Sequence, residues 1–168
     1  MEISDKEFKQ WSRIGSRAAF GIAALKLGAT IDDLIILSGD TSTSAGLERF
    51  KKTYPEKFLD VGIAEQNMMG IAAGLASEGE TVYTATFAPF QTMRCCEQIK
   101  VNLGYMKHKV CFVGLASGLV LGNLGYTHCC IEDVAVMRSI PNITVVAPAD
   151  CGETVKAALA AAEYGSSV

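Results

Sequence analysis

The fold is decided by the stretch Asp60–Ala76, which reads DVGIAEQNMMGIAAGLA. It begins in an apolar segment, Phe58–Val61, that predicts a β-strand, turns at Gly62, and continues as a predicted helix of small and apolar residues. The first turn of that helix carries a carboxylate, Glu65. An acid at a strand-to-helix junction lies where open α/β sheets bind ligands, beyond the carboxyl end of a strand. A carboxylate also stabilises a helix start without any ligand, so this segment alone leaves both roles open.

The helix that follows Gly62 carries further glycines at positions 70, 74 and 79. Because glycine has no side chain, one side of this helix offers almost no bulk. We therefore expect that side to pack closely against a neighbouring element.

Strands and helices alternate along the chain. Short apolar or β-branched runs predict strands at 34–38, 57–61, 81–86, 109–116 and 143–147. Helices are predicted at 4–28, after Gly62, and at 89–103, 131–139 and 150–163, the first and last with capping-box spacing. This alternation predicts one three-layer αβα domain of the α/β class over residues 1–168, with a mostly parallel sheet. The chain stops where such a pattern would return to the sheet, so we expect a fragment of a longer protein.

The composition is that of a well-buried globular protein. Of the 168 residues, 49% are hydrophobic and 20% are charged, which is enough for one domain with a substantial core. The net charge of −3 and the scattered Lys and Arg residues disfavour nucleic acid as a partner. The longest uncharged stretch, Val110–Cys130, is interrupted by glycines and His128, so it predicts a strand and a loop rather than a membrane span. The polar first residues do not resemble a secretion signal.

The chain has six cysteines, at positions 95, 96, 111, 129, 130 and 151. Two adjacent pairs and two single residues form neither a C-x-x-C metal motif nor a disulfide framework. We therefore expect reduced thiols and a cytoplasmic protein.

Several short motifs occur in a characteristic order. They are Asp60–Gln66, Thr86–Phe90, Tyr126–His128, Ile140–Asn142 and Ala147–Asp150. Together they resemble the pyrimidine-binding domain of the transketolase family, and in particular the separately encoded C-terminal subunit of split bacterial and archaeal transketolases. The resemblance covers the chain from about Arg17 to the last helix. It implies the thiamine-diphosphate-binding fold, and it implies transfer of two-carbon ketol units between sugar phosphates or related ketoses.

The resemblance assigns cofactor-binding roles to Glu65, Phe87, Phe90, Met93 and Asp40. In the family, the acid that matches Glu65 bonds to a ring nitrogen of the aminopyrimidine, which makes Glu65 a catalytic candidate. The aromatic residues that match Phe87 and Phe90 surround that ring, and Met93 stands where another aromatic often lies. Ordinary core packing would give the same spacing of apolar residues, and Asp40 is also a common turn residue.

The resemblance also assigns substrate-binding roles to Arg17, Ser44 and His128. Arg17 and Ser44 match residues that bind the substrate's phosphate, for which the planar guanidinium is well suited. His128 matches a catalytic histidine that contacts sugar oxygens, where a neutral imidazole can both donate and accept. An arginine on a helix is more often simply solvated. A zinc site made from His128 and the two adjacent cysteines has poor geometry, so no metal site is expected in this chain.

Two positions depart from the family pattern. Ala116 replaces a second substrate histidine, and Leu124 replaces an aspartate that binds a sugar hydroxyl. Each lost polar partner removes about 1–3 kcal/mol of substrate discrimination. We therefore expect an unusual or less hydroxylated ketose.

The chain lacks the Gly-Asp-Gly…Asn segment that holds Mg²⁺ and the diphosphate in this superfamily. The resemblance therefore implies a partner, the diphosphate-binding N-terminal subunit, and little cofactor binding by the chain alone. The exposed glycine-rich helix and the Phe87–Met93 face would favour homo-oligomers. The alternatives are a β-type subunit of a 2-oxoacid dehydrogenase, a deoxyxylulose-phosphate-synthase-like subunit, and a scaffold subunit without catalytic function.

Overall fold

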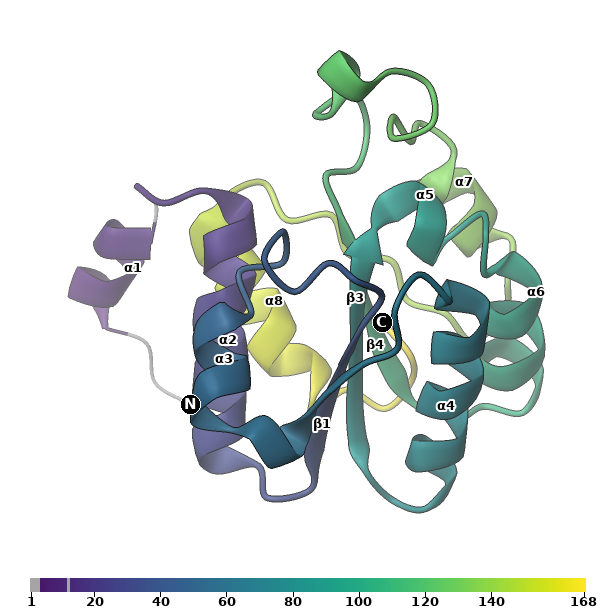
Figure 1. Cartoon of the computed structure of the whole chain (residues 1–168), viewed down its shortest axis with the longest axis horizontal. Helices are drawn as coiled ribbons and strands as arrows, with labels where there is room; N and C mark the ends of the chain where they lie inside the picture. The colour runs from purple at the N-terminus through teal and green to yellow at the C-terminus, as the bar shows by residue number, and fades with distance from the viewer. Residues whose placement is uncertain (1–3, 12) are drawn as a thin grey trace.

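The computed structural model describes residues 4–11 and 13–168, which form one parallel sheet of four strands in the order β2-β1-β3-β4 (Figure 1). The strands are β1 (Leu34–Ser38), β2 (Phe58–Asp60), β3 (Thr81–Phe87) and β4 (Val110–Leu115). Helices lie on both faces of this sheet, which confirms the predicted α/β class with three layers. None of the described helices is both long enough and apolar enough to cross a membrane.

The register of the strands brings their carboxyl ends to one edge of the sheet. Ser38 at the end of β1 lies opposite Asp60 of β2 and Ala85 of β3. Phe87 at the end of β3 lies opposite Leu115 of β4. The segments that leave these strands therefore meet at the same edge, and they carry most of the predicted site residues.

One face of the sheet is covered by α2 (Ser16–Thr30), α3 (Glu48–Thr53) and α8 (Cys151–Ala161) (Figure 1). Buried side chains of this layer, including Phe20 and Phe50, form one apolar cluster with the sheet. Tyr83 of β3 belongs to the same cluster, and its hydroxyl donates a hydrogen bond of 2.6 Å to the carbonyl oxygen of Ala158. That bond satisfies a buried polar group and ties the sheet to α8.

The other face is covered by α4 (Glu65–Ser77), α6 (Cys96–Gln98), the π-helix η2 (Ile99–Tyr105) and α7 (Asp133–Arg138). Met68 and Met69 of α4 are fully buried there, in a second apolar cluster with Leu37 and Ile99. The helix that carries Glu65 is therefore anchored firmly on the sheet.

The first predicted helix, at 4–28, is two helices. The chain forms α1 (Asp5–Trp11) and then α2, which begins after Gly15 in an extended backbone conformation. The capping box is confirmed, because the Glu7 backbone N–H donates to Ser4 Oγ and the Ser4 N–H donates to the Glu7 carboxylate. The box stabilises a start, but it does not specify how far the helix extends.

The predicted helix at 89–103 is also interrupted. It consists of α5 (Ala88–Gln91), a turn over 92–95, α6 and η2. The hydroxyl of Thr92 donates to the carbonyl oxygen of Ala88 at 2.7 Å, and the backbone N–H groups of Met93 and Arg94 both donate to Pro89. The chain turns here, and Arg94 is thereby directed toward the start of α4.

The predicted strand at 143–147 is wrong. Among the described residues, Ile143 makes one isolated parallel bridge, to Ser167, and residues 144–147 belong to no strand ladder. Ser167 and Val168 lie between this segment and β4, where the Phe112 N–H donates to the Val168 carbonyl at 2.8 Å. A cleft of about 670 Å³ is lined by residues of both β4 and the 144–148 segment. The Thr144 N–H donates to the Ser167 carbonyl oxygen at 3.0 Å, but residues 144–147 form no strand ladder with any described residue, so their β-branched propensity alone does not make a strand.

The expected close packing of the glycine side of α4 is wrong within this chain. Gly70 and Gly74 are exposed, and a Cβ at either position would meet no atom of another described element within 4 Å. The side of α4 that carries Gly70 and Gly74 is thus exposed and does not pack against another described element of this chain.

Candidate active site

Glu65 is the first residue of α4 and lies in a buried position. Its side chain is only 3% exposed. A Cβ built on Gly39, which follows β1, would lie 3.2 Å from Glu65 Cγ and 3.7 Å from Thr86 Cβ. The carboxylate is therefore held between the ends of β1 and β3, and glycine at position 39 provides the space for it. A buried carboxylate requires a compensating partner.

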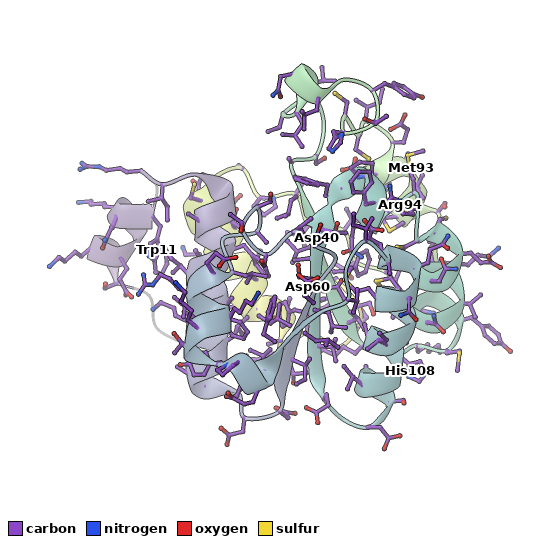
Figure 2. The ribbon with its side chains drawn as sticks, in the orientation of Figure 1. Trp11, Asp40, Asp60, Met93, Arg94 and His108 are labelled. Carbon is purple, nitrogen blue, oxygen red and sulfur yellow. The ribbon has the colours of Figure 1, made fainter. Side chains whose placement is uncertain are left out.

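Arg94 is the partner of this carboxylate. Its Nη1 lies 2.7 Å from Glu65 Oε2, and its guanidinium carbon lies 3.9 Å from the centroid of the Phe90 ring. The Arg94 carbonyl oxygen accepts a hydrogen bond of 2.9 Å from the Gln66 side-chain amide. The guanidinium and the backbone carbonyl of Arg94 are thus both bound to the first residues of α4. Figure 2 shows Arg94 together with Met93 above that helix.

An aromatic cluster adjoins the Arg94–Glu65 pair. The Phe87 and Phe90 rings meet edge to face with centroids 6.0 Å apart, and the His128 ring lies 5.6 Å from Phe87 and 5.3 Å from Phe90. Nδ1 of His128 is 3.0 Å from the hydroxyl of Thr127. The loop after β4 therefore brings His128 to the phenylalanines that begin and end the first turn of α5.

Asp40 lies beside this pocket in a left-handed backbone conformation, with φ of 58°. One oxygen of Asp60, Oδ1, holds this turn, because it accepts from the Asp40 N–H at 3.1 Å and from the Gly62 N–H at 2.9 Å. Asp40 itself is exposed. The neighbour of Asp40, Gly39, is the residue that contacts the Glu65 side chain, so Asp40 stands at the rim of the pocket.

The remaining predicted residues lie further out. Met93 is 49% exposed, whereas Phe87 and Phe90 are half-buried, so less of the Met93 side chain packs against the rest of the protein. Ser44 is half-buried in the turns before α3, and no hydrogen bond among the described residues joins it to the Glu65 pocket. Arg17 lies on α2, and its side chain is outside the described part of the structure. Ala116 has a positive φ of 55°, and Leu124 is exposed in the loop after β4.

The residues at this site fit a flat heterocycle with a polar edge. Aromatic faces and a buried carboxylate lie together, and the fully buried hydroxyl of Thr86 has no hydrogen-bond partner among the residues that the structure describes. Thr86 Cβ lines the same gap beside Gly39 and Glu65. An aminopyrimidine offers the ring faces and the ring nitrogens that such a set can bind. No group of three or more His, Cys, Asp or Glu side chains among the described residues could hold a metal ion.

Two buried cysteines near the site, Cys95 and Cys130, are not activated nucleophiles. Burial raises the pKa of the Cys95 thiol to about 12, and the Glu65 carboxylate adds to this shift. Burial also raises the pKa of Cys130. Both residues therefore remain protonated thiols at neutral pH, and neither supplies a thiolate.

Sequence reasoning gave no role to Arg94 or to the side chain of Asp60. Arg94 follows Phe90 by four residues, which is a spacing at which helical side chains meet, but the helix is interrupted between them. Only the turn over 92–95 shows that the guanidinium reaches Glu65. Asp60 stood within the recognised motif, two residues before a glycine with φ of 72°, a pattern typical of an Asx turn.

Comparison with known proteins gives consistent matches. Residues 12–168 match the family described as "Transketolase, pyrimidine binding domain". A Methanocaldococcus jannaschii protein named "Putative transketolase C-terminal section" is 39% identical over 150 residues, which are 89% of this chain and 48% of that protein. One of the subunits of the "Apulose-4-phosphate transketolase" of Phocaeicola vulgatus is 37% identical over 143 residues, which are 85% of this chain and 46% of that protein. The chain spans about half the length of these relatives.

A solved structure gives the same assignment. "Split gene transketolase, inactive beta4 tetramer" has a TM-score of 0.82 and 38% identity to this chain, and the match covers 92% of this chain and 49% of that one. The family match extends over almost the whole sequence, and it agrees with the α/β architecture and with the order of the motifs. The chain therefore belongs to the transketolase family, as a pyrimidine-binding domain.

Proposed function

We propose that this chain is the pyrimidine-binding part of a thiamine-diphosphate-dependent transketolase, which transfers two-carbon ketol units between sugar phosphates or related ketoses. The observation that carries the proposal is the burial of Glu65, only 3% exposed, at the carboxyl edge of the sheet, where its partner Arg94 lies over the Phe90 ring that meets Phe87. Burying a carboxylate costs free energy unless a partner compensates the charge, and the partner here is the 40% exposed side chain of Arg94, which a polar ligand can replace. The named relatives are transketolases, which favours this reaction over that of a 2-oxoacid dehydrogenase or a deoxyxylulose-phosphate synthase.

In this proposal each residue has a separate task. Glu65 shares a proton with a ring nitrogen of the aminopyrimidine, while Phe87 and Phe90 enclose the ring and Met93 lines its outer side. Asp40 contacts the cofactor from the rim, and His128 exchanges hydrogen bonds with the ketose oxygens. Bound thiamine diphosphate supplies the carbon nucleophile that cleaves and rebuilds the ketose. Arg17 and Ser44 bind the phosphate of the substrate.

A partner chain completes the site. We place Mg²⁺ and the diphosphate on an N-terminal transketolase subunit, because one relative is named as a C-terminal section and another as one subunit of a transketolase. The open glycine side of α4 gives a surface on which another chain can pack closely. A homo-oligomer without the partner is also proposed, since a similar solved structure is named an inactive beta4 tetramer. We place the complex in the cytoplasm.

The substrate is proposed to be a phosphorylated ketose with fewer hydroxyl contacts than usual. Ala116 and Leu124 bring no polar side-chain atoms to the loop after β4, where ordinary transketolases bind sugar oxygens. One relative is named for apulose 4-phosphate, which is a precedent for an unusual ketose.

The test is a paired assay. The chain is purified with a diphosphate-binding N-terminal transketolase subunit and is assayed on a panel of ketose phosphates with thiamine diphosphate and Mg²⁺. Glu65→Gln should lower kcat by about 100-fold or more. Glu78→Gln is the matched control, because Glu78 is an exposed glutamate at the other end of the same helix. Full turnover of the Glu65→Gln complex would favour the scaffold function instead.

A further inference from the structure

Arg94 contacts the Glu65 carboxylate and the Phe90 ring, the two groups that bind the cofactor ring in the proposed function. Its guanidinium pairs with Glu65 Oε2 at 2.7 Å, and its central carbon lies 3.9 Å from the Phe90 ring centroid. The guanidinium is planar and stacks on an aromatic face much as a pyrimidine ring would. The same carboxylate oxygen and the same face of Phe90 cannot accept the ring while the guanidinium remains there.

The backbone of Arg94 is fixed, whereas its side chain has room to move. The Gln66 amide holds the Arg94 carbonyl at 2.9 Å, and the Arg94 N–H donates to the Pro89 carbonyl at 3.1 Å. The Arg94 side chain is nevertheless 40% exposed, while that of Glu65 is 3% exposed. The guanidinium can therefore turn toward solvent without unfolding the turn over 92–95. Glu65 has no comparable freedom, because its side chain is only 3% exposed and a Cβ at Gly39 would lie 3.2 Å from its Cγ.

The ion pair also compensates the charge of the buried Glu65 carboxylate. An unpaired charge at a site as closed as that of Glu65 is strongly unfavourable, and a nearby cation relieves this. Because Arg94 is partly in solvent, the net attraction is weaker than that of a fully buried pair. A ligand that bonds to the carboxylate and stacks on Phe90 can therefore replace it.

We propose that the Arg94 side chain is the counter-ion of Glu65 in the free chain and lies where the aminopyrimidine binds. Its guanidinium must therefore rotate away from Glu65 and Phe90 when the ring binds. This proposal rests on the proposed function, since it takes the ring to be the ligand of Glu65. Removing the guanidinium should tighten binding of the ring to the free chain. If the pocket is open in about one molecule in ten, the apparent affinity rises about tenfold.

The test uses the purified chain alone and a probe without diphosphate, 4-amino-5-hydroxymethyl-2-methylpyrimidine. Binding is measured by ligand-observed NMR and by calorimetry for the wild type, Arg94→Met, Arg94→Lys and Glu65→Gln/Arg94→Met. Met keeps an apolar chain over Phe90 and removes the charge, whereas Lys keeps the charge without the planar group. Arg49→Met is the control, because Arg49 is an exposed arginine on α3. Circular dichroism and thermal unfolding establish that each variant is folded.

Arg94→Met should bind the probe about tenfold more tightly than the wild type, Arg49→Met should match the wild type, and the double variant should not bind. Binding by Arg94→Met that is equal to or weaker than the wild type would overturn the proposal, and so would its failure to bind saturating probe. Neither outcome bears on the paired assay, where turnover that depends on Glu65 would still support the proposed function. Full turnover of Glu65→Gln in that assay would reject the proposed function whatever Arg94→Met does.

Discussion

Two carboxylates lie five positions apart at the carboxyl edge of the sheet and are used in opposite ways. Asp60 is exposed, and its Oδ1 accepts hydrogen bonds from the backbone of Asp40 and Gly62. Glu65 is buried, and its partner is the partly exposed side chain of Arg94. Backbone partners cannot leave without unfolding the turn, whereas a side chain can rotate away. Asp60 therefore acts as a structural residue, and Glu65 remains available to a ligand.

The contrast also explains why the surroundings of the two acids differ. The turn at Asp60 contains Asp40 and Gly62, both with positive φ, so its hydrogen bonds maintain an otherwise uncommon backbone. The Glu65 pocket contains Gly39, the buried Thr86 hydroxyl and an aromatic cluster, which together shape a space. Substitutions at Asp60 should therefore change the free energy of unfolding, and substitutions at the Glu65 pocket should change ligand binding and turnover.

The largest effect is expected when Glu65→Gln and Asp60→Ala are compared in the paired enzyme. Glu65→Gln should lose about 100-fold or more in kcat, because the amide cannot exchange a proton with the ring nitrogen. Its stability should change by less than about 1 kcal/mol, since Arg94 remains partly solvated. Asp60→Ala should retain most of its kcat per folded molecule. If the two variants lost turnover equally, the division of roles would be wrong.

Gly39→Ala should have the next largest effect. The new Cβ would lie 3.2 Å from Glu65 Cγ, so the carboxylate must shift by a few tenths of an ångström. We expect a loss of about tenfold in cofactor affinity from this displacement, corresponding to about 1.4 kcal/mol. Titration of thiamine diphosphate into the paired apoenzyme measures it. Gly122→Ala serves as the control, because a Cβ there meets no atom within 4 Å. An unchanged affinity would show that the position of Glu65 is not critical.

Arg94→Met should lower the stability of the free chain by about 1–2 kcal/mol at neutral pH, because it leaves a buried carboxylate unpaired. The double variant Glu65→Gln/Arg94→Met should recover most of that loss, since the charge is then gone. Urea unfolding of the wild type, the two single variants and the double variant gives the coupling between the residues. Additive effects would mean that the ion pair contributes nothing to the folded chain.

Asp60→Ala is expected to have the smallest effect, a loss of about 0.5–1.5 kcal/mol in urea unfolding. The Asp40 and Gly62 N–H groups lose their acceptor, but both lie where water can replace it. Asp60→Asn retains the accepting oxygen and should lose less. A loss in Asp60→Asn as large as that in Asp60→Ala would assign the effect to charge rather than to the hydrogen bonds.

The sequence allowed prediction of the elements whose signals are local. The apolar run of β1, the turn at Gly62 and the Asp150 cap of α8 were all predicted, and the Glu153 N–H does donate to Asp150 Oδ1 at 2.8 Å. The fold class followed from the alternation of such elements. Phe87, Phe90 and His128 were named together from motifs, and the structure brings their rings within 6.0 Å of one another.

What could not be predicted depends on partners that are distant in the sequence. Residues 90–103 contain neither Gly nor Pro, so nothing local marks the turn that directs Arg94 to Glu65. The 143–147 segment has strand propensity, but its pairing with described residues is limited to the bridge between Ile143 and Ser167 and the Thr144 hydrogen bond to Ser167. The open glycine side of α4 could not be distinguished from a buried one, because small residues suit either an internal or an intersubunit contact.

The most direct test of the central claim is a crystal structure of this chain with the proposed N-terminal subunit, thiamine diphosphate and Mg²⁺. We predict a Glu65 carboxylate oxygen within about 3 Å of a nitrogen of the aminopyrimidine ring. We also predict that the ring lies against Phe90 and that the Arg94 guanidinium has left that face. A structure in which the cofactor binds elsewhere while Glu65 is still paired with Arg94 would contradict the account.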